Sequence, residues 1–395
     1  MSGARHLHDL LFVLGRITCF IATVTATSMV LSRGGTVSAA PTGVGPAAQL
    51  GGRAFVGYHP SWNDRGAPLG AIAGQYSHVM LSFARPDLMW SGLESGTWKG
   101  TGLEFSAPPD KVKEEVALLK ATGAKVILSV GGASYGGWST LAAEAGHDNQ
   151  QIKNALTQIV RDLGLDGLDV DYERHAADAA TVEEYTRVIQ ALREAVDAAR
   201  PDGILALAAS PTGSDYTAAT GDEGTGRRSG SGGSAGRERM TFRRTVPSGP
   251  HAGRTVGELV DLLNIMAYDS GSNFYDQAVA YEQYRAIMPA RTVVTIGMIS
   301  GKHAWGDSIL VNRIADATCK GSVNIADQYR RPSGASNSVE RLADIVLAGK
   351  DHPLDGLMLW HVAKQPEITC DGRPPASPAS IAEIVRAKFA PHTGP

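Results

Sequence analysis

Short apolar runs recur along the chain, and longer amphipathic segments lie between most of them. A compact apolar run bounded by turn residues is typical of a buried strand, whereas apolar residues spaced three and four apart indicate a helix. By these criteria the sequence predicts eight strands, at Arg53–Tyr58, Ser77–Ala84, Lys125–Val130, Leu165–Arg174, Ile204–Ser210, Leu262–Tyr268, Val293–Met298 and Gly356–Trp360.

Helical patterns separate most of these strands. Two prolines precede the first helix and Gly123 follows it, as expected at helix ends. Strands that alternate with helices over this length predict a single (β/α)8 TIM barrel. A doubly wound open sheet is the alternative, but no glycine-rich phosphate-binding turn follows the first strand. Six helices are predicted, at Asp110–Thr122, Asn149–Leu163, Thr181–Arg200, Asp276–Ile287, Val339–Ala348 and Ser380–Phe389.

Residues 214–254, between the fifth and sixth predicted strands, break this alternation. They are rich in Gly, Ser and Arg. Such a segment cannot bury enough apolar surface to order itself, so we expect a long flexible insertion. This insertion would lie on the face where a TIM barrel has its active site. It is either a flap over substrate or, more simply, a surface insertion without a specific function.

The first forty residues have the pattern of an export signal. Arg5 and Arg16 precede an apolar stretch, Ile17–Leu31, and a small-residue cleavage pattern follows at residues 37–40. Thr and Ser side chains interrupt the apolar stretch, which disfavours stable insertion in a membrane. We therefore expect a signal peptide at 1–40, a linker at 41–52, one folded domain at 53–390, and a secreted protein.

Composition and charge restrict the possible binding partners more than they restrict the fold. The formal net charge of −3 is spread without long runs of one sign, apart from a basic cluster in the insertion, so no nucleic-acid partner is expected. A neutral polymer is compatible with this balance. Cys19 would leave with the signal, and Cys319 and Cys370 would form one disulfide after export or stay free thiols in a reducing compartment.

The fourth predicted strand carries acidic residues where a buried strand is normally apolar. Alternate residues project from one face of a strand, so Asp169, Asp171 and Glu173 form one row, and the apolar residues between them face the other way. Like charges this close cannot all ionise cheaply, so one carboxyl keeps a proton that it can donate to a leaving group. A calcium loop is disfavoured, because it needs glycine where Tyr172 stands.

Residues 166–173, DGLDVDYE, resemble the DGxDxDxE signature of glycoside hydrolase family 18, the chitinases and their relatives. Three further strand ends are similar to motifs of that family: SVGG at 129–132, MAYD at 266–269, and Trp360 at the end of the eighth strand. Tyr172 departs from the tryptophan of many chitinases. We expect little chemical effect there, because that side chain faces away from the acidic row.

The resemblance implies a retaining glycosidase in which the substrate's own N-acetyl oxygen is the nucleophile, an exception to the usual scheme of two carboxylates. Glu173 would be the general acid and then the general base. Asp171 would hydrogen-bond the acetamido nitrogen and stabilise the oxazolinium intermediate, and Asp169 would tune Asp171 by sharing a proton. Tyr268 would fix the acetamido oxygen. No metal or cofactor is expected.

Substrate-binding residues are implied in the same way. Trp360 would form an aromatic floor beneath a sugar ring, and Asp269 would contact the sugar on the leaving side. Met266 would touch substrate or be plain core packing. Tyr58 and Ser129 would be hydrogen-bond partners of Asp169. Five further tryptophans in predicted loops are candidates to extend the groove: Trp62, Trp90, Trp98, Trp138 and Trp305.

The implied activity is cleavage of β-1,4 bonds in chitin or other N-acetylglucosamine polymers by a monomer. An endo-β-N-acetylglucosaminidase acting on N-glycans shares every motif. A non-catalytic lectin on the same barrel is disfavoured, because Glu173 is present. Residues 299–355 are too few for the α+β insertion domain of many chitinases, so we expect a shallower cleft that favours endo cleavage.

Overall fold

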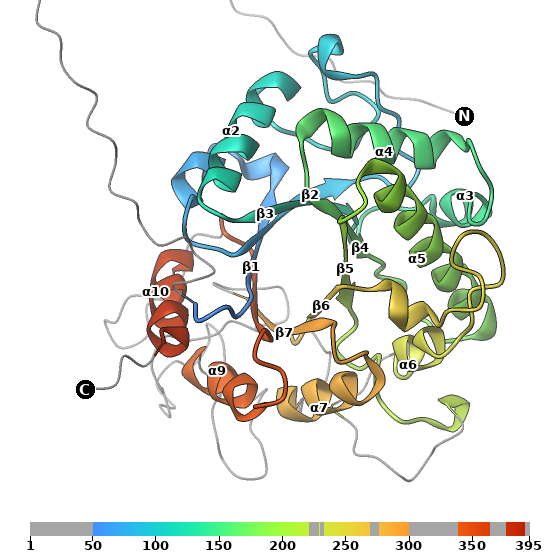
Figure 1. The fold of residues 1–395 in the computed structure, drawn as a ribbon, viewed down its shortest axis with the longest axis vertical. Coiled ribbons are helices and arrows are strands. Elements are labelled where there is room, and N and C mark those ends of the chain that lie inside the picture. Colours follow the sequence, from blue (N-terminus) through green and yellow to red (C-terminus); the bar gives the residue numbers. More distant parts are fainter. Residues whose placement is uncertain are drawn as a thin grey trace, which may run out of the picture. The chain divides into compact units, whose positions relative to one another are not determined.

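The computed structural model describes residues 50–220, 229, 233–268, 276–299, 339–363 and 377–391. Eight parallel strands close into a barrel in the order β1 to β8 (Figure 1). The predicted TIM barrel is therefore confirmed. The strands are β1 Phe55–Pro60, β2 His78–Ala84, β3 Lys125–Gly131, β4 Gly167–Asp171, β5 Ile204–Ala209, β6 Leu262–Ile265, β7 Val293–Ile299 and β8 Gly356–Trp360.

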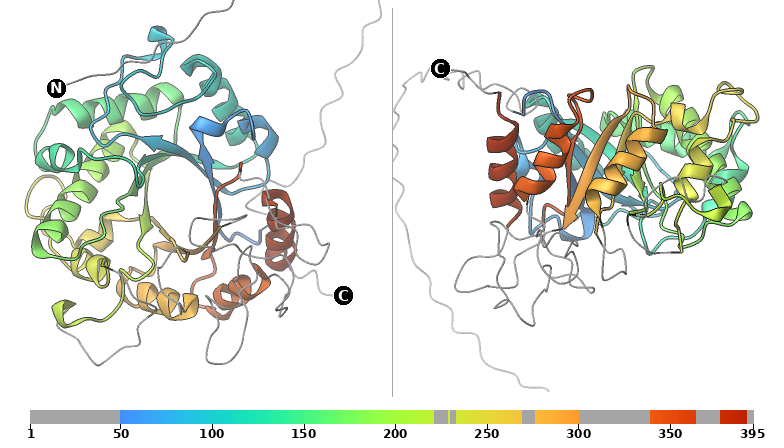
Figure 2. Two further views of the ribbon diagram at one scale, coloured as in Figure 1. Left: turned by 180° about the vertical axis from the view of Figure 1, so that it is seen from behind. Right: turned by 90° about the horizontal axis from the view of Figure 1, so that it is seen from below.

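Helices surround the ring of strands (Figures 1 and 2). All six predicted helices are present, with ends shifted by up to two residues. Two more, α3 and α6, were not predicted, because six residues are too few for a periodic pattern to stand out. The helices are α2 Pro109–Ala121, α3 Trp138–Ala143, α4 Gln151–Leu163, α5 Ala179–Ala199, α6 Arg237–Phe242, α7 Gln277–Ile287, α9 Val339–Ala348 and α10 Pro378–Phe389.

Two apolar layers hold the barrel together. The larger fills the space between the strands and the surrounding helices, and it includes Leu168, Val170 and Tyr172, the outward-facing residues of the acidic strand segment. The smaller lies inside the barrel and contains Val56, Tyr58, Met80, Ile127, Ala206, Ala208, Leu262 and Met358. Inward and outward faces alternate along each strand, as a packed barrel requires.

Asp166 anchors the amino end of β4. Its Oδ2 accepts a hydrogen bond of 2.9 Å from the Val126 backbone N–H, and its Oδ1 lies 3.0 Å from Arg200 Nη1 and 3.1 Å from Lys120 Nζ. Asp166 is 3 % exposed. The first acid of the DGxDxDxE pattern therefore joins β3, α2 and the end of α5 at the end of the barrel opposite to Glu173.

The prediction of one flexible loop over residues 214–254 was wrong for the part of it that the structure describes. Residues 233–254 contain α6, and the side chains of Arg237, Glu238 and Arg239 are each at most 1 % exposed. Composition misled because Arg237 and Glu238 pair with each other and Arg239 donates to the Ser214 carbonyl, so these charged groups have partners inside the protein instead of being solvated. Residues 221–228 and 230–232 lie outside the described residues.

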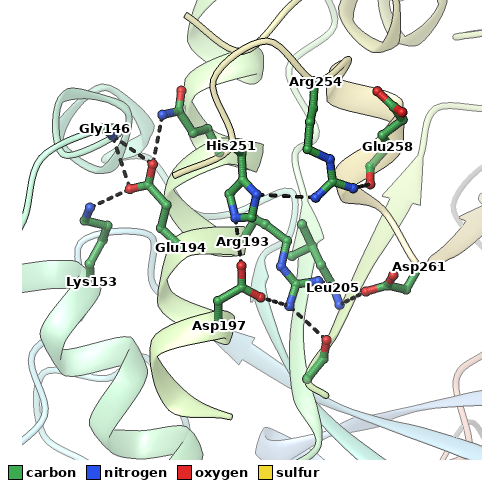
Figure 3. A network of polar contacts seen from close by, with 12 residues as sticks. Gly146, Lys153, Arg193, Glu194, Asp197, Leu205, His251, Arg254, Glu258 and Asp261 are labelled. Atoms are coloured by element: carbon green, nitrogen blue, oxygen red, sulfur yellow. Dashed lines mark hydrogen bonds and ion pairs between the residues drawn. The ribbon is translucent and has the colours of Figure 1, made fainter. Parts of the chain in front are cut away.

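Polar contacts of α5 fix the last part of the connection between β5 and β6 (Figure 3). Arg193 bonds Asp261 Oδ2 at 2.8 Å and Asp197 Oδ1 at 2.5 Å, and Asp197 Oδ2 lies 2.7 Å from His251 Nε2. One turn away, Glu194 accepts from Lys153 Nζ of α4 at 2.6 Å. Multiply bonded ion pairs such as these, centred on the buried Arg193 and Glu194, order a chain segment that has few apolar residues.

Several predictions made from the sequence fall outside the described residues: the signal peptide at 1–40, Asp269, Trp305, Cys319 and Cys370. Most of the interval between β7 and β8, residues 300–338, lies outside them as well. Of the helices that the structure describes, none combines the length and apolar character needed to cross a bilayer.

Candidate active site

A cavity of about 700 Å³ opens at the carboxyl ends of the strands. Side chains in or just after the ends of β1, β4, β6 and β8 line it, among them Tyr58, Asp171, Glu173, Tyr268 and Trp360. This is the face on which TIM barrels carry their sites. The structure therefore brings the residues singled out in four separate strand ends into one cavity.

The acidic row lies where the sequence predicts it, but the strand is shorter. β4 ends at Asp171, and Glu173 stands two residues beyond it, partly exposed at the cavity. Asp169 is 0 % and Asp171 4 % exposed. Across the β4–β5 register they stand beside Ala206 and Ala208, whose small side chains leave room for the carboxylates inside the barrel.

Gly131 and Gly132 let the loop after β3 pass close to Asp171. Gly131 has φ +119°, and a Cβ there would stand 2.1 Å from the carbonyl oxygen of Asp171. The N–H of Gly132 donates to that oxygen at 2.9 Å. The two glycines of the SxGG pattern therefore fix the end of β4, because any side chain would push the acidic strand away.

Asp169 begins a chain of hydrogen bonds across the barrel interior. Its Oδ2 accepts from Tyr58 OH at 3.0 Å and from Ser129 Oγ at 2.6 Å, so the two predicted partners are in place. Asn264 Nδ2 donates to Tyr58 OH at 3.3 Å, and Thr295 Oγ1 donates to Asn264 Oδ1 at 2.7 Å. Asn264 and Thr295 were not predicted from the sequence, although each is a polar residue in an apolar strand.

Burial dominates the electrostatics of the pair. It raises the pKa of Asp169 to about 6, against the opposing hydrogen bonds from Ser129 and Tyr58. Burial, then the nearby charges of Glu173 and Asp169, raise the pKa of Asp171 well above its usual range, while Arg237 acts in the opposite direction. The pair therefore retains a proton near neutral pH.

Burial, with Asp169 and Asp171 nearby, also raises the pKa of Tyr58 well above its usual value. The phenol therefore stays a hydrogen-bond donor across the working pH range of a protein. Asp171 Oδ1 is buried and accepts no hydrogen bond from any described residue. An acceptor left open in this position can receive a donor from a bound molecule.

Aromatic side chains form one wall of the cavity. The rings of Trp360 and Phe83 stack with centroids 5.4 Å apart, and Trp62 stacks on Phe83 at 5.9 Å. Trp62 is 47 % exposed. The peptide bonds Ser82–Phe83 and Trp360–His361 are cis. Phe83 was not predicted as a site residue, because its position is that of an ordinary apolar residue of a strand.

Met266 and Tyr268 line the cavity from the segment after β6. Both are partly exposed, and both also pack against the apolar layer inside the barrel. Tyr268 OH lies 4.0 Å from Met358 Sδ of β8.

The other loop tryptophans differ in their surroundings. Trp138 is 2 % exposed and packs edge-on against Tyr172, with centroids 5.1 Å apart. Trp90 and Trp98 pack on each other at 5.9 Å, and neither lines the cavity. Of the described tryptophans proposed to extend the groove, Trp62 is placed to do so. Across the described ranges, no group of three or more His, Cys, Asp and Glu side chains is arranged to hold a metal ion.

The family model described as glycosyl hydrolases family 18 matches residues 54–286. Endochitinase 1 of Metarhizium anisopliae is 32 % identical over 198 residues, which are 45 % of this chain and 44 % of that protein. Chitinase D of Niallia circulans is 30 % identical over 141 residues, 35 % of this chain and 24 % of that protein. The chain thus spans less than half the length of these curated relatives.

Solved structures share the fold. A GH18 chitinase from Pseudoalteromonas aurantia superposes with a TM-score of 0.51 at 18 % identity, covering 85 % of this chain and 99 % of that one. A GH18 chitinase from Cycas revoluta gives 0.52 at 16 %, covering 85 % and 100 %. The family model spans more than half of the 395 residues and includes the motifs that follow β3, β4 and β6. The chain therefore belongs to the glycosyl hydrolases of family 18.

Proposed function

We propose that the chain is a chitinase-like glycosidase that cleaves β-1,4 bonds between N-acetylglucosamine units with retention of configuration. The observation that carries the proposal is that Asp171, whose buried Oδ1 has no hydrogen-bond partner among the described residues, lines the same cavity as Glu173. An acceptor for an amide N–H beside a carboxyl group suits a substrate that carries an N-acetyl group next to the bond to be cut.

In the first step Glu173 donates its proton to the glycosidic oxygen, and the acetamido oxygen of the substrate attacks the anomeric carbon. The bond to the leaving sugar breaks, and an oxazolinium ion forms. In the second step the Glu173 carboxylate takes a proton from water, whose oxygen attacks the same carbon and reopens the ring. Two inversions at one carbon give retention, and Glu173 ends protonated as it began.

Asp171 would accept the acetamido N–H, turn the acetamido oxygen toward the anomeric carbon and stabilise the positive oxazolinium. The raised pKa of Asp169 supports its part as the second site of a shared proton, which moves toward Asp169 as positive charge develops beside Asp171. Tyr268 would donate to the acetamido oxygen.

The aromatic wall supports sugar binding. The apolar faces of pyranose rings stack on indole and phenyl rings, so Trp360 would hold the sugar at the cleaved bond, and Phe83 and Trp62 would carry sugars further along the chain. Met266 would pack beside the ring, and Asp269 would contact the leaving side. The names endochitinase and chitinase of the curated relatives support an N-acetylglucosamine polymer as substrate.

We also propose export of a monomer after cleavage of residues 1–40, with Cys319 and Cys370 joined in one disulfide. The intact mass of protein recovered from the medium, with and without alkylation of free thiols, tests both points. Retention of residues 1–40, or two alkylated cysteines, would contradict them. Light scattering of the same sample tests the monomer.

The test of the activity is mass spectrometry of products from chitin oligomers and, separately, from an N-glycosylated protein. We expect short N-acetylglucosamine oligomers from the first, and none from Glu173→Gln, which should still bind the oligomers. Glu114→Gln makes the same chemical change at a side chain 64 % exposed on α2 and should match the wild type.

Other products would change the assignment. Glycans released without one core sugar would identify an endo-β-N-acetylglucosaminidase. Binding of oligomers without any product would identify a sugar-binding protein. Unchanged turnover by Glu173→Gln would remove Glu173 as the acid.

A further inference from the structure

Arg237, at the start of α6, is a buried cation at the wall of the cavity. Its side chain is 1 % exposed. Its Nη1 donates to the carbonyl oxygen of Arg174, the residue directly after Glu173. The guanidinium carbon lies 5.2 Å from the ring centre of Tyr172 and 4.9 Å from that of Tyr185. Arg237 therefore contacts the residues immediately before and immediately after Glu173.

Glu238 continues this contact to the next strand. Its Oε1 accepts from Arg237 Nη2 at 2.5 Å and from the Ser210 backbone N–H at 2.9 Å. Ser210 follows β5 directly and lines the cavity. A Cβ on Gly213 would stand 1.8 Å from Glu238 Oε2, so the chain has no room for a side chain there. The Arg237–Glu238 pair thus links the chain after β4 to the chain after β5.

Stability does not explain this pair. Removing two charges from water is costly, and well-packed apolar residues of similar size often stabilise a protein as much as a buried ion pair does. What apolar residues cannot provide is a fixed donor to the Arg174 carbonyl and a positive charge beside the carboxylates. Both properties concern the position and charge of the acidic row.

We propose that Arg237 is a positioning residue, which holds the segment of Glu173 at the cavity and supplies positive charge to the carboxylates of the acidic row. The role in turnover rests on the proposed function. The anchoring of residues 172–178 stands on the contacts alone. Glu238 is its counter-charge and its link to β5.

The groups facing Asp171 set the expected pH dependence. They are Asp169 of β4, Glu173 beyond it, Tyr58 of β1, Tyr185 of α5 and Arg237 of α6. Burial and the two acids raise the pKa of Asp171, and Arg237 opposes them. Loss of the arginine charge should therefore keep Asp171 protonated to higher pH, and the acidic limb of kcat/KM should move up.

Three variants separate charge from geometry: Arg237→Lys, Arg237→Gln, and Arg237→Gln combined with Glu238→Gln, which leaves no unpaired buried charge. Arg244→Gln is the matched control, because Arg244 follows α6, pairs with Glu183 and is 42 % exposed. Each variant is assayed on an N-acetylglucosamine tetramer across pH, and hydrogen exchange of residues 172–178 is followed by mass spectrometry.

We expect Arg237→Gln to lower kcat by about 10- to 100-fold with little change in KM, because a displaced acid loses rate more than binding. Its acidic limb should rise by about one pH unit. Arg237→Lys should keep the acidic limb in place and regain only part of kcat. Residues 172–178 should exchange faster in both Gln variants than in the wild type.

The proposal would be overturned if Arg237→Gln had the same kcat, pH profile and hydrogen exchange as Arg244→Gln. If that variant does not fold, wild-type kcat in Arg237→Lys would overturn it, because a lysine cannot reproduce the planar donor geometry of a guanidinium. If the wild type itself hydrolyses nothing, the proposed function fails. The exchange of residues 172–178 still decides the anchoring role in that case.

Discussion

At the scale of single residues, Asp169 matters through its neighbours. It does not line the cavity itself, yet its hydrogen bonds with Tyr58 and Ser129 lower its pKa against the effect of burial. A carboxyl group held this way can change its protonation without moving, which suits a residue whose task is to tune Asp171 rather than to touch substrate.

Tyr58→Phe tests this arrangement. The change removes one of the two donors to Asp169 Oδ2 and leaves Asn264 Nδ2 without its acceptor. We expect the free energy of unfolding to fall by about 1 to 3 kcal/mol. The acidic limb of kcat/KM should move to higher pH, because that hydrogen bond lowers the pKa of Asp169.

Denaturant titration and pH profiles check this prediction. Tyr281→Phe is the control, because its OH also donates to a buried carboxylate, Asp355 Oδ2 at 2.7 Å, and Tyr281 does not line the cavity. A Tyr58→Phe enzyme with the wild-type pH profile would show that Tyr58 only fills space in the barrel.

The acidic row was predictable from sequence because it violates a strong pattern. Three carboxylates at alternate positions in an apolar strand project from one face of that strand. Such residues are rare in a buried strand unless they have a function. Arg237 carries no such signal, because it lies in a segment whose composition resembles a disordered loop. Phe83 was hidden for the opposite reason, since an aromatic residue within an apolar strand is ordinary.

At the scale of elements, the two ends of β4 have different surroundings. Asp166 at the amino end ties the strand to β3, α2 and α5, whereas Asp171 and Glu173 at the carboxyl end face the cavity. Gly167 lies between them, where a Cβ would stand 1.9 Å from the Ile204 carbonyl oxygen of β5. The strand is therefore held at its amino end, while its carboxyl end presents two acidic side chains to the cavity.

Asp166→Ala should separate these two roles. It leaves the Val126 N–H without its acceptor and removes the anion between Arg200 and Lys120, which should cost about 3 to 5 kcal/mol of unfolding free energy. The kcat per folded molecule should stay near the wild-type value. Thermal unfolding and active-site titration measure the two effects, and a loss of kcat without loss of stability would contradict the division.

The order and type of the elements were predictable, whereas their ends were not. Periodicity identifies long helices and buried strands, but β4 and β6 end earlier than their apolar patterns. At the end of β4 the carbonyl of Asp171 accepts from the N–H of Gly132, which lies just beyond the end of β3. Such tertiary contacts leave no mark in a local pattern.

At the scale of the whole molecule, buried titratable groups make stability depend on pH. The pKa of Asp169 is about 6 in the folded protein and about 3.9 in an unfolded chain. A raised carboxyl pKa means that folding is favoured when the group is protonated. The contribution of Asp169 to the free energy of unfolding is therefore fully present below about pH 4 and is lost as the pH rises to about 6.

Asp169→Asn removes this dependence. The difference in unfolding free energy between variant and wild type should change by roughly 3 kcal/mol between pH 4 and 6, in favour of the variant as pH rises. The wild-type curve alone is a poor guide, because burial lowers the pKa of His78 to about 4 and acts with the opposite sign. Denaturant titrations at each pH measure the difference, and parallel curves for the two proteins would refute the raised pKa.

The position of Asp166 and Gly167 has a consequence for how a family signature is read. These two residues hold the barrel together, so a descendant that had lost its acid would still be selected to keep them. Retention of most of the motif is then evidence of shared ancestry and fold. In any newly sequenced relative, the presence of enzyme activity should be judged from the residues aligned with Asp171 and Glu173.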